Sequence, residues 1–158
     1  MKKEIIKILN SVFYIGHIPY APGTCASVAA YILYWFFPYK GYVLFFMLVL
    51  LSVLGVWLTG LGEDVYENHD DKRIVLDEFI GAGFALLFMP QNWVFYILSF
   101  SLFRLFDILK PIGIKKTQNL KKGLGIIADD VAAGISANIA TWVVFSLMLI
   151  LARYVFEA

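Results

Sequence analysis

Apolar residues occur in long runs along this chain, and short polar segments separate the runs. Two runs, residues 42–61 and 131–156, reach the roughly 20 residues that an α-helix needs to cross the hydrocarbon core of a bilayer. Three shorter runs cover residues 26–37, 79–89 and 93–106. Helices of that length either thin the bilayer locally or re-enter it from one side, and the pattern leaves both arrangements open. The chain is therefore predicted to be an all-α, polytopic bundle of four to five membrane helices.

The first ten residues follow a different pattern. Lys2, Lys3, Glu4 and Lys7 are interleaved with isoleucines and leucine, in a segment too short and too polar for a cleaved signal peptide. We expect an amphipathic helix that lies on the membrane surface. No internal repeat, low-complexity tract or flexible linker divides the chain, so residues 1–158 are expected to form a single membrane-embedded domain.

Composition strengthens the membrane interpretation. Hydrophobic residues make up 61% of the chain and aromatic residues 17%, which exceeds what a soluble domain of 158 residues needs for its core. The formal net charge of +1 conceals a separation, because the charged residues gather in short connecting segments. Cys25 is the only cysteine, which excludes an internal disulfide and a thiolate metal cluster. We expect no nucleic acid partner, and the sequence leaves the oligomeric state open.

Topology follows from the lysines and arginines, because the short cytoplasmic loops of membrane proteins are enriched in them. If the helices alternate, one side of the membrane receives only Lys40 and Arg153. The other side receives the remaining basic residues, namely Lys2, Lys3, Lys7, Lys72, Arg73, Arg104, Lys110, Lys115, Lys116, Lys121 and Lys122. We expect this second side to be cytoplasmic and to carry three polar segments, residues 16–27, 63–81 and 103–134.

The first polar segment runs into an apolar helix through Pro22, Gly23 and Thr24. Gly23 permits close backbone approach, Thr24 is predicted to be the N-cap, and the free N–H groups of the first turn are suited to a phosphate oxygen. The alternative, for this segment alone, is an ordinary capped helix start. His17 is expected to be an interfacial polar residue rather than a general base.

Carboxylates gather in the other two segments, at the predicted membrane boundary. Asp77 and Glu78 immediately precede one apolar run, and Asp129 and Asp130 precede the last. Charges there are costly unless they are paired or bind metal, although carboxylates also favour a helix N-terminus on their own. Helix capping is therefore the alternative for each pair taken alone.

The third segment also contains Arg104, Asp107 and Lys110, whose spacing of three places them on one face of a helix. A salt-bridged helix end is the alternative interpretation. Mg²⁺ prefers carboxylate oxygens, and these segments supply enough of them for one or two ions. The candidate metal ligands and catalytic residues are Asp77, Glu78, Asp107, Asp129 and Asp130. By contrast, a solvated face is expected for Glu63, Asp64 and Glu67.

Four motifs in these segments resemble those of the phosphatidylglycerophosphatase A family and occur in the family's order. The motifs are Pro19-x-Ala21-Pro22-Gly23-Thr24-x-x-Ser27, Asp77-Glu78-Phe79-x-Gly81, Phe103-Arg104-x-Phe106-Asp107-x-x-Lys110-Pro111 and Gly125-Ile126-x-x-Asp129-Asp130-x-x-Ala133-Gly134. The resemblance extends over residues 16–134, which is most of the chain. It implies a Mg²⁺-dependent bacterial phosphatase of the cytoplasmic (inner) membrane, with its active site facing the cytoplasm.

The implied reaction is hydrolysis of phosphatidylglycerophosphate to phosphatidylglycerol and phosphate in phospholipid biosynthesis. On this chain the resemblance implies that the five acids hold Mg²⁺, directly or through water. Arg104 and Lys110 would contact the phosphate, and Gly23 with Thr24 would complete its cradle. Whether a carboxylate forms a phospho-enzyme or water attacks directly is left open by the spacing.

Two other classes remain as alternatives. A CDP-alcohol phosphatidyltransferase also uses aspartates and Mg²⁺ at the membrane boundary, but its Asp-Gly-x-x-Ala-Arg signature is missing from this chain. A non-enzymatic protein would use basic pairs such as Lys115-Lys116 and Lys121-Lys122 to attract anionic lipid. Dependence on CTP would indicate the first alternative, and tolerance of acid-to-amide changes would indicate the second.

Overall fold

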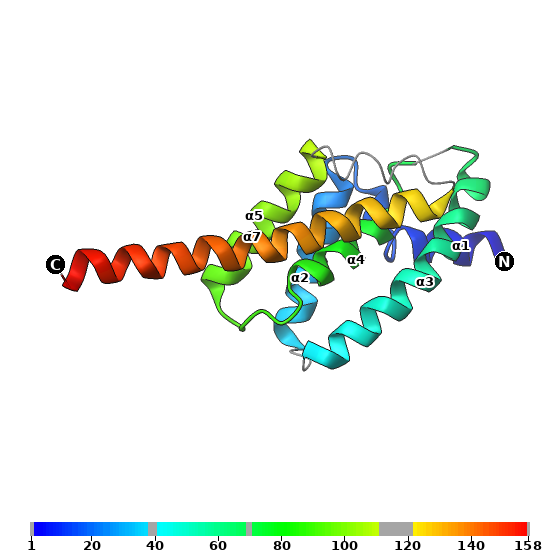
Figure 1. Ribbon diagram of the computed structural model, residues 1–158. Coiled ribbons are helices and arrows are strands. Elements are labelled where there is room, and N and C mark those ends of the chain that lie inside the picture. The colour runs from blue at the N-terminus through cyan, green and yellow to red at the C-terminus, as the bar shows by residue number, and fades with distance from the viewer. Residues whose placement is uncertain (1, 38–40, 69–70, 111–121, 158) are drawn as a thin grey trace.

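The computed structural model describes residues 2–37, 41–68, 71–110 and 122–157 (Figure 1). Within these residues the regular secondary structure is helical, and no strand forms. The helices are α1 (Lys2–Asn10), the short 3₁₀ helix η1 (Ile15–His17), α2 (Pro22–Phe36), α3 (Gly41–Tyr66), α4 (Leu76–Ala85), α5 (Trp93–Leu109) and α7 (Gly123–Glu157). The expectation of an all-α fold is confirmed.

Three helices, α2, α4 and α7, begin well before their apolar runs, and α4 starts at Leu76. α2 begins at Pro22, because proline at the first helical position lacks only an N–H that would have no partner there. α7 begins at Gly123, so Asp129 and Asp130 lie inside the helix and not ahead of it. An apolar run shows only which part of a helix has apolar surroundings. The helix itself can begin earlier, because its backbone hydrogen bonds also form through polar residues whose side chains have partners.

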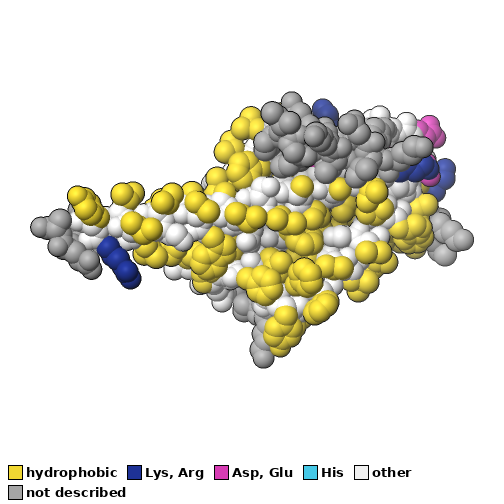
Figure 2. All heavy atoms as spheres, in the orientation of Figure 1, with side chains coloured by type: hydrophobic (Ala, Val, Ile, Leu, Met, Phe, Trp, Pro, Cys, Tyr) yellow, Lys and Arg dark blue, Asp and Glu magenta, His cyan; other side chains and the backbone are white. Residues whose placement is uncertain are grey.

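α3 and α7 are the two described helices that are long and apolar enough to cross a membrane. In their most apolar stretches only 22% and 11% of the residues are buried inside the protein. A core helix of a soluble protein would be mostly buried, so these exposed apolar side chains require a non-aqueous environment. Figure 2 shows apolar side chains over much of the visible face, and charged ones mainly near the end where α3 finishes and α7 begins. The chain is a membrane protein, and its number of crossings stays a prediction.

α7 is the axis of the bundle. It runs along the whole protein, and α3, α4 and α5 pack against it (Figure 1). Its C-terminal part continues beyond the other helices, and Ile150, Leu151 and Tyr154 on that part are more than half exposed. The core and the polar residues of the candidate site therefore lie along the earlier part of α7.

α4 is a short helix enclosed by the others. Its ten residues extend about 15 Å, roughly half of a hydrocarbon core, and residues 80–85 are all buried. A helix that ends inside a bundle leaves carbonyl groups that need donors. Asn138 of α7 supplies one, because its Nδ2 donates to the carbonyl oxygens of Ala85 at 3.1 Å and Leu87 at 2.7 Å. Ser99 of α5 donates to Ala85 as well, at 3.0 Å.

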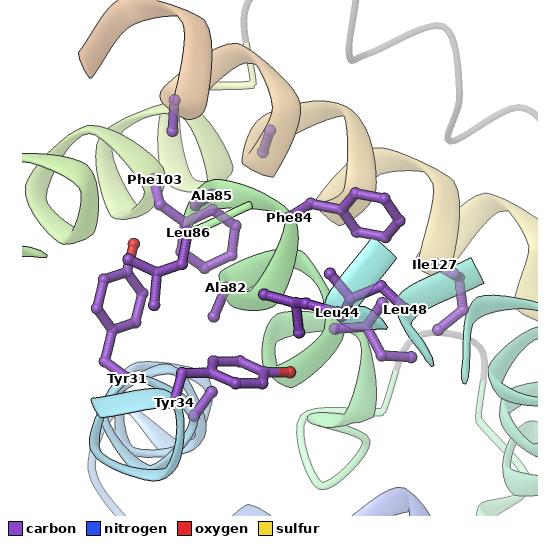
Figure 3. Packing of buried hydrophobic residues seen from close by; sticks show 14 residues of the cluster. Tyr31, Tyr34, Leu44, Leu48, Ala82, Phe84, Ala85, Leu86, Phe103 and Ile127 are labelled. Atoms are coloured by element: carbon purple, nitrogen blue, oxygen red, sulfur yellow. The ribbon is translucent and has the colours of Figure 1, made fainter. Parts of the chain in front are cut away.

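The apolar core surrounds α4 (Figure 3). Its larger members come from five helices and the residue after α4, and they are Tyr31, Tyr34, Leu44, Leu48, Ile80, Phe84, Leu86, Phe103 and Ile127. α4 and α7 cross with their backbones in contact at two glycines. A Cβ on Gly81 would lie 2.6 Å from the backbone oxygen of Asp130, and a Cβ on Gly134 would overlap the carbonyl of Gly81. Both positions therefore need glycine.

The N-terminal helix α1 is anchored by its last residue. Asn10 is fully buried, and its Nδ2 donates to the carbonyl of Leu58 on α3 at 2.9 Å. Ile5 and Leu9 remain exposed, at 52% and 37%. The placement of this amphipathic helix on the membrane surface stays a prediction.

Candidate active site

The spacing of acids and glycines explains how two helices bring their carboxylates together. Asp77 lies one turn before Gly81 on α4, and Asp130 lies one turn before Gly134 on α7. Residues four apart share a helix face, so the backbone contact at the two glycines also brings the two aspartates together.

Asp77, Glu78 and Asp130 form a trio of carboxylates, in which one oxygen from each lies within 4.8 Å of the others. Asp77 and Asp130 are only 8% and 3% exposed. Each of the three has a buried oxygen without a hydrogen-bond partner among the described residues. Unpartnered buried carboxylate oxygens are costly, and a hard divalent cation is the partner that an all-oxygen set suits. The trio therefore fits a metal such as Mg²⁺, whose identity stays a prediction.

Arg104 and Asp107 are both on α5, and they lie beside the trio. Nη1 of Arg104 contacts Oδ2 of Asp107 at 2.6 Å, as expected for residues three apart on a helix. The same nitrogen donates to the Oγ of Ser27 on α2 at 3.3 Å. Nε of Arg104 is buried and has no partner among the described residues. One part of the guanidinium is thus fixed, while another donor is available to an anion.

Lys110 joins the end of α5 to α7. It is the C-cap of α5, with a left-handed backbone (φ 42°), so its side chain leaves the helix and Nζ reaches Oδ2 of Asp129 at 2.5 Å. Burial on its own lowers the pKa of Lys110, but the hydrogen bond and the charge of Asp129 outweigh this and raise it. The lysine is therefore a fixed cation near the acids.

The first turn of α2 lies against Glu78. A Cβ on Gly23 would overlap the Glu78 carboxyl group. The backbone at this glycine therefore does approach another group closely, as expected, and that group is an acid. The prediction that Thr24 is the N-cap is wrong. The cap is Ala21, in a left-handed backbone with φ 47°, and Pro22 takes the first helical position. Thr24 is half-buried inside the first turn.

The acids outnumber the nearby cations. Five formal negative charges lie in the site, on Asp77, Glu78, Asp107, Asp129 and Asp130. The positive charges of Arg104 and Lys110 balance two of them, which leaves three unbalanced in the described part of the chain. Burial raises the pKa of Asp77, and the carboxylates of Glu78 and Asp130 raise it further. Burial is also the main cause that raises the pKa of Glu78. A bound cation would oppose these effects by favouring the ionised carboxylates.

Glu63 and His17 are two polar residues whose exposure differs. The expected solvated face is wrong for Glu63, which is 8% exposed because it shares the buried face of α3 with Gly62 and Tyr66, while Asp64 and Glu67 are exposed as expected. His17 is exposed, and its ring lies near that of Tyr66. Residues 69–70 and 111–121, which include Lys115, Lys116 and Lys121, lie outside the described residues.

Ser27 is a site residue to which sequence reasoning gave no role. It is fully buried, its Oγ donates to the carbonyl of Gly23 at 2.9 Å, and it accepts the hydrogen bond from Arg104. The available signal was a serine one turn after Gly23 in an otherwise apolar helix. Its partner on α5 is 77 residues away in the sequence, so no local pattern could identify the contact.

Comparison with known proteins identifies the family. The sequence profile of phosphatidylglycerophosphatase A matches residues 8–145, which is most of the chain. The chain belongs to the phosphatidylglycerophosphatase A family. The matched range contains every site residue described above, and membership in this enzyme family makes the chain a lipid phosphatase.

Three curated relatives of this phosphatidylglycerophosphatase A family member are similar over most of their length. Phosphatidylglycerophosphatase A of Haemophilus influenzae is 37% identical, over 91% of each chain. Phosphatidylglycerophosphatase A of Escherichia coli is 36% identical, over 80% of this chain and 76% of its own. A Bacteroides thetaiotaomicron protein, named provisionally as a phosphatidylinositol-3-phosphatase, is 35% identical over 87% of this chain and 94% of its own. No solved structure matches the chain.

Proposed function

We propose that this protein is a Mg²⁺-dependent phosphatase that hydrolyses phosphatidylglycerophosphate to phosphatidylglycerol and inorganic phosphate in phospholipid biosynthesis. The observation that carries the proposal is the trio of Asp77, Glu78 and Asp130, each with a buried unpartnered oxygen, beside Arg104 and Lys110. Acids suited to a divalent cation next to cations suited to phosphate oxygens form an arrangement that can hydrolyse a phosphate monoester. Family membership supports the choice of substrate.

The acids would bind the metal. Asp77, Glu78 and Asp130 would hold Mg²⁺ directly, because each has an oxygen free to do so among the described residues. Asp107 and Asp129, whose oxygens are engaged by Arg104 and Lys110, would act through water. The metal, when bound, supplies positive charge that neutralises the phosphate and acidifies the attacking water.

The cations and the first turn of α2 would bind the phosphate. Arg104 offers its unpartnered Nε, while Ser27 and Asp107 hold Nη1 in place. A guanidinium held in this way is suited to phosphate oxygens because its donors are pre-oriented. Lys110 adds a second positive charge, and the first turn of α2 at Gly23 and Thr24 adds N–H groups that have no partner within the helix.

We also propose that the protein crosses the membrane several times, with the site facing the cytoplasm. Arg73 lies four residues before Asp77, and Lys122 directly precedes the start of α7, whereas Arg153 lies near the C-terminal end of α7. A topology test uses Lys122→Cys and Arg153→Cys in a Cys25→Ser background, labelled on intact cells with an impermeant maleimide. In intact cells we expect only the Arg153→Cys variant to be labelled. After permeabilisation we expect the Lys122→Cys variant to be labelled as well. Labelling of the Lys122 variant from outside would reverse the orientation.

The activity test is phosphate release from phosphatidylglycerophosphate by purified protein in detergent, with Mg²⁺ or with EDTA. Release is expected only with Mg²⁺, and Asp129→Asn and Asp130→Asn should each abolish it. The control Asp64→Asn makes the same change at an acid whose side chain is 63% exposed, and it should leave activity unchanged. Loss of release in the control as well, or full activity in either site variant, would refute the assignment of the site.

A folding measurement accompanies the activity test. Mg²⁺ should raise the melting temperature of the wild type, because a ligand that binds only the folded state stabilises it. Asp130→Asn should lose that increase and, without metal, melt at or above the wild-type temperature, since one buried charge is removed.

The second substrate to assay is phosphatidylinositol 3-phosphate, which the name of the Bacteroides relative suggests. Both lipids present a phosphate monoester on a headgroup derived from a polyol, so the trio and Arg104 would treat the reacting phosphate alike. The ratio of kcat/KM for the two lipids decides between them. The transferase class would instead require CMP and would convert phosphatidylglycerophosphate to CDP-diacylglycerol and glycerol 3-phosphate, without release of inorganic phosphate.

A further inference from the structure

An apolar groove of about 350 Å³ runs between α2 and α5. Val28 and Ile32 of α2 form one wall, and Ile97 of α5 forms the other; these three side chains are 41%, 54% and 65% exposed. The rings of Tyr31 and Phe100 line it as well, and they contact each other edge to face at 5.3 Å between centroids. The groove is therefore an open, aromatic-lined channel on the surface of the protein.

The groove is closed at the end far from the candidate site. There Trp35 and Trp93 stack with their ring centroids 3.8 Å apart, which joins the last turn of α2 to the first turn of α5. Nε2 of Gln91 donates to the carbonyl of Trp35 at 2.6 Å and ties the preceding loop to the same place.

The other end of the groove meets the candidate site. Val28 directly follows Ser27, and Phe100 lies one turn before Arg104 on α5. The hydrogen bond from Arg104 to Ser27 joins the two helices at this end. A molecule whose phosphate contacts Arg104 would therefore have its remaining part at the mouth of an apolar channel.

The length of the groove indicates what fits it. From Ser27 to Trp35 along α2 the rise is about 12 Å, at roughly 1.5 Å per residue. One leaflet of a hydrocarbon core is about 15 Å deep, half of the roughly 30 Å total. The groove thus matches an extended acyl chain from a single leaflet, with its polar end at the site.

We propose that this groove binds an acyl chain of the substrate lipid during phosphate hydrolysis. The inference rests on the proposed function, since it takes the molecule at Arg104 to be a phospholipid. Burying the chain against Tyr31, Ile97 and Phe100 contributes binding free energy remote from the reacting phosphate. The groove therefore makes the enzyme prefer diacyl lipid over the same headgroup without acyl chains.

The test fills the groove and compares two substrates. Ile97→Trp places a larger ring in the channel, and Ile139→Trp makes the same change at a 59% exposed position on α7 outside it. The two variants and the wild type are assayed in detergent with diacyl phosphatidylglycerophosphate and with its deacylated, water-soluble headgroup. Melting temperature and elution from a sizing column report folding.

Ile97→Trp should lower kcat/KM for the diacyl lipid by about tenfold, the loss expected when about two buried methylene groups are displaced. The effect should appear mainly in KM. Hydrolysis of the headgroup should change less than about twofold, and Ile139→Trp should match the wild type on both substrates.

Equal effects of Ile97→Trp and Ile139→Trp on the diacyl lipid would overturn the proposal, because the groove would then hold bulk lipid or a neighbouring protein. A loss by Ile97→Trp that is as large on the headgroup as on the lipid would also overturn it. If wild type releases no phosphate from either substrate, the proposed function itself fails, and the acyl-chain site fails with it.

Discussion

Gly81 is the position where a single methyl group should separate the two halves of the proposed metal site. In Gly81→Ala the new Cβ would lie 2.6 Å from the backbone oxygen of Asp130 and 2.9 Å from the ring of Phe103. The backbone oxygen cannot rotate away, so α4 and α7 must move apart by about 0.8 Å to reach an ordinary contact of 3.4 Å. Asp77 and Asp130, one turn before each crossing glycine, must separate with them.

The expected cost in stability is small and the cost in activity is large. Overpacking costs about 1–3 kcal/mol, and the better helix propensity of alanine returns about 1 kcal/mol. The net loss in free energy of unfolding is then about 0–2 kcal/mol. Mg²⁺ demands ligands close to 2.0–2.1 Å in near-octahedral geometry, and a misplacement of roughly 1 Å can cost about 100-fold in rate. We therefore expect kcat to fall about 10- to 100-fold, with a higher Mg²⁺ concentration at half-maximal activity.

Gly60→Ala is the matched control. Gly60 also lies inside a helix, but a Cβ there would meet only the backbone nitrogen of Gly123 at 3.9 Å, an ordinary contact. This variant should keep wild-type kcat and melt at the same or a higher temperature. Phosphate release over a Mg²⁺ titration and melting followed by tryptophan fluorescence measure both effects. The reasoning is refuted if Gly81→Ala keeps more than half of wild-type activity while folded, or if both variants lose activity equally.

Three further predictions concern polar contacts. Lys110→Met should lower activity at least about tenfold, because Asp129 loses its ion-pair partner and the phosphate loses a cation; Lys110→Arg should recover part of it, and wild-type activity in Lys110→Met would exclude a role. Asn138→Leu should lower the free energy of unfolding by about 2 kcal/mol, since carbonyls at the end of α4 lose their donor; an unchanged melting temperature would contradict this. Hydrogen bonds from Arg73 lower the pKa of Asp71, so that pair stabilises the fold above about pH 4 and less below it; the melting difference between wild type and Asp71→Asn should shrink on acidification, and a difference that grows would have the wrong sign.

Local patterns in the sequence predicted what depends on neighbouring residues. A helix satisfies its own backbone hydrogen bonds, so a long apolar run is enough to predict a membrane helix such as α3. The pair of Arg104 and Asp107 was predictable for the same reason, because residues three apart on a helix meet regardless of the rest of the fold. The clustering of acids at the ends of apolar runs also pointed to segments that the structure brings together.

The tertiary structure decided which residues meet across helices. The trio exists because α4 and α7 cross at Gly81 and Gly134, and no local pattern specifies that crossing. The contact of Lys110 with Asp129 and the burial of Glu63 likewise depend on the helix packed opposite each residue. The sequence by itself determined a helical membrane protein with acids gathered at the ends of apolar runs, because those features follow from short-range backbone and solvation energetics. The assembly of those acids into one site required the packing of helices, whose contacts join residues 50 or more positions apart.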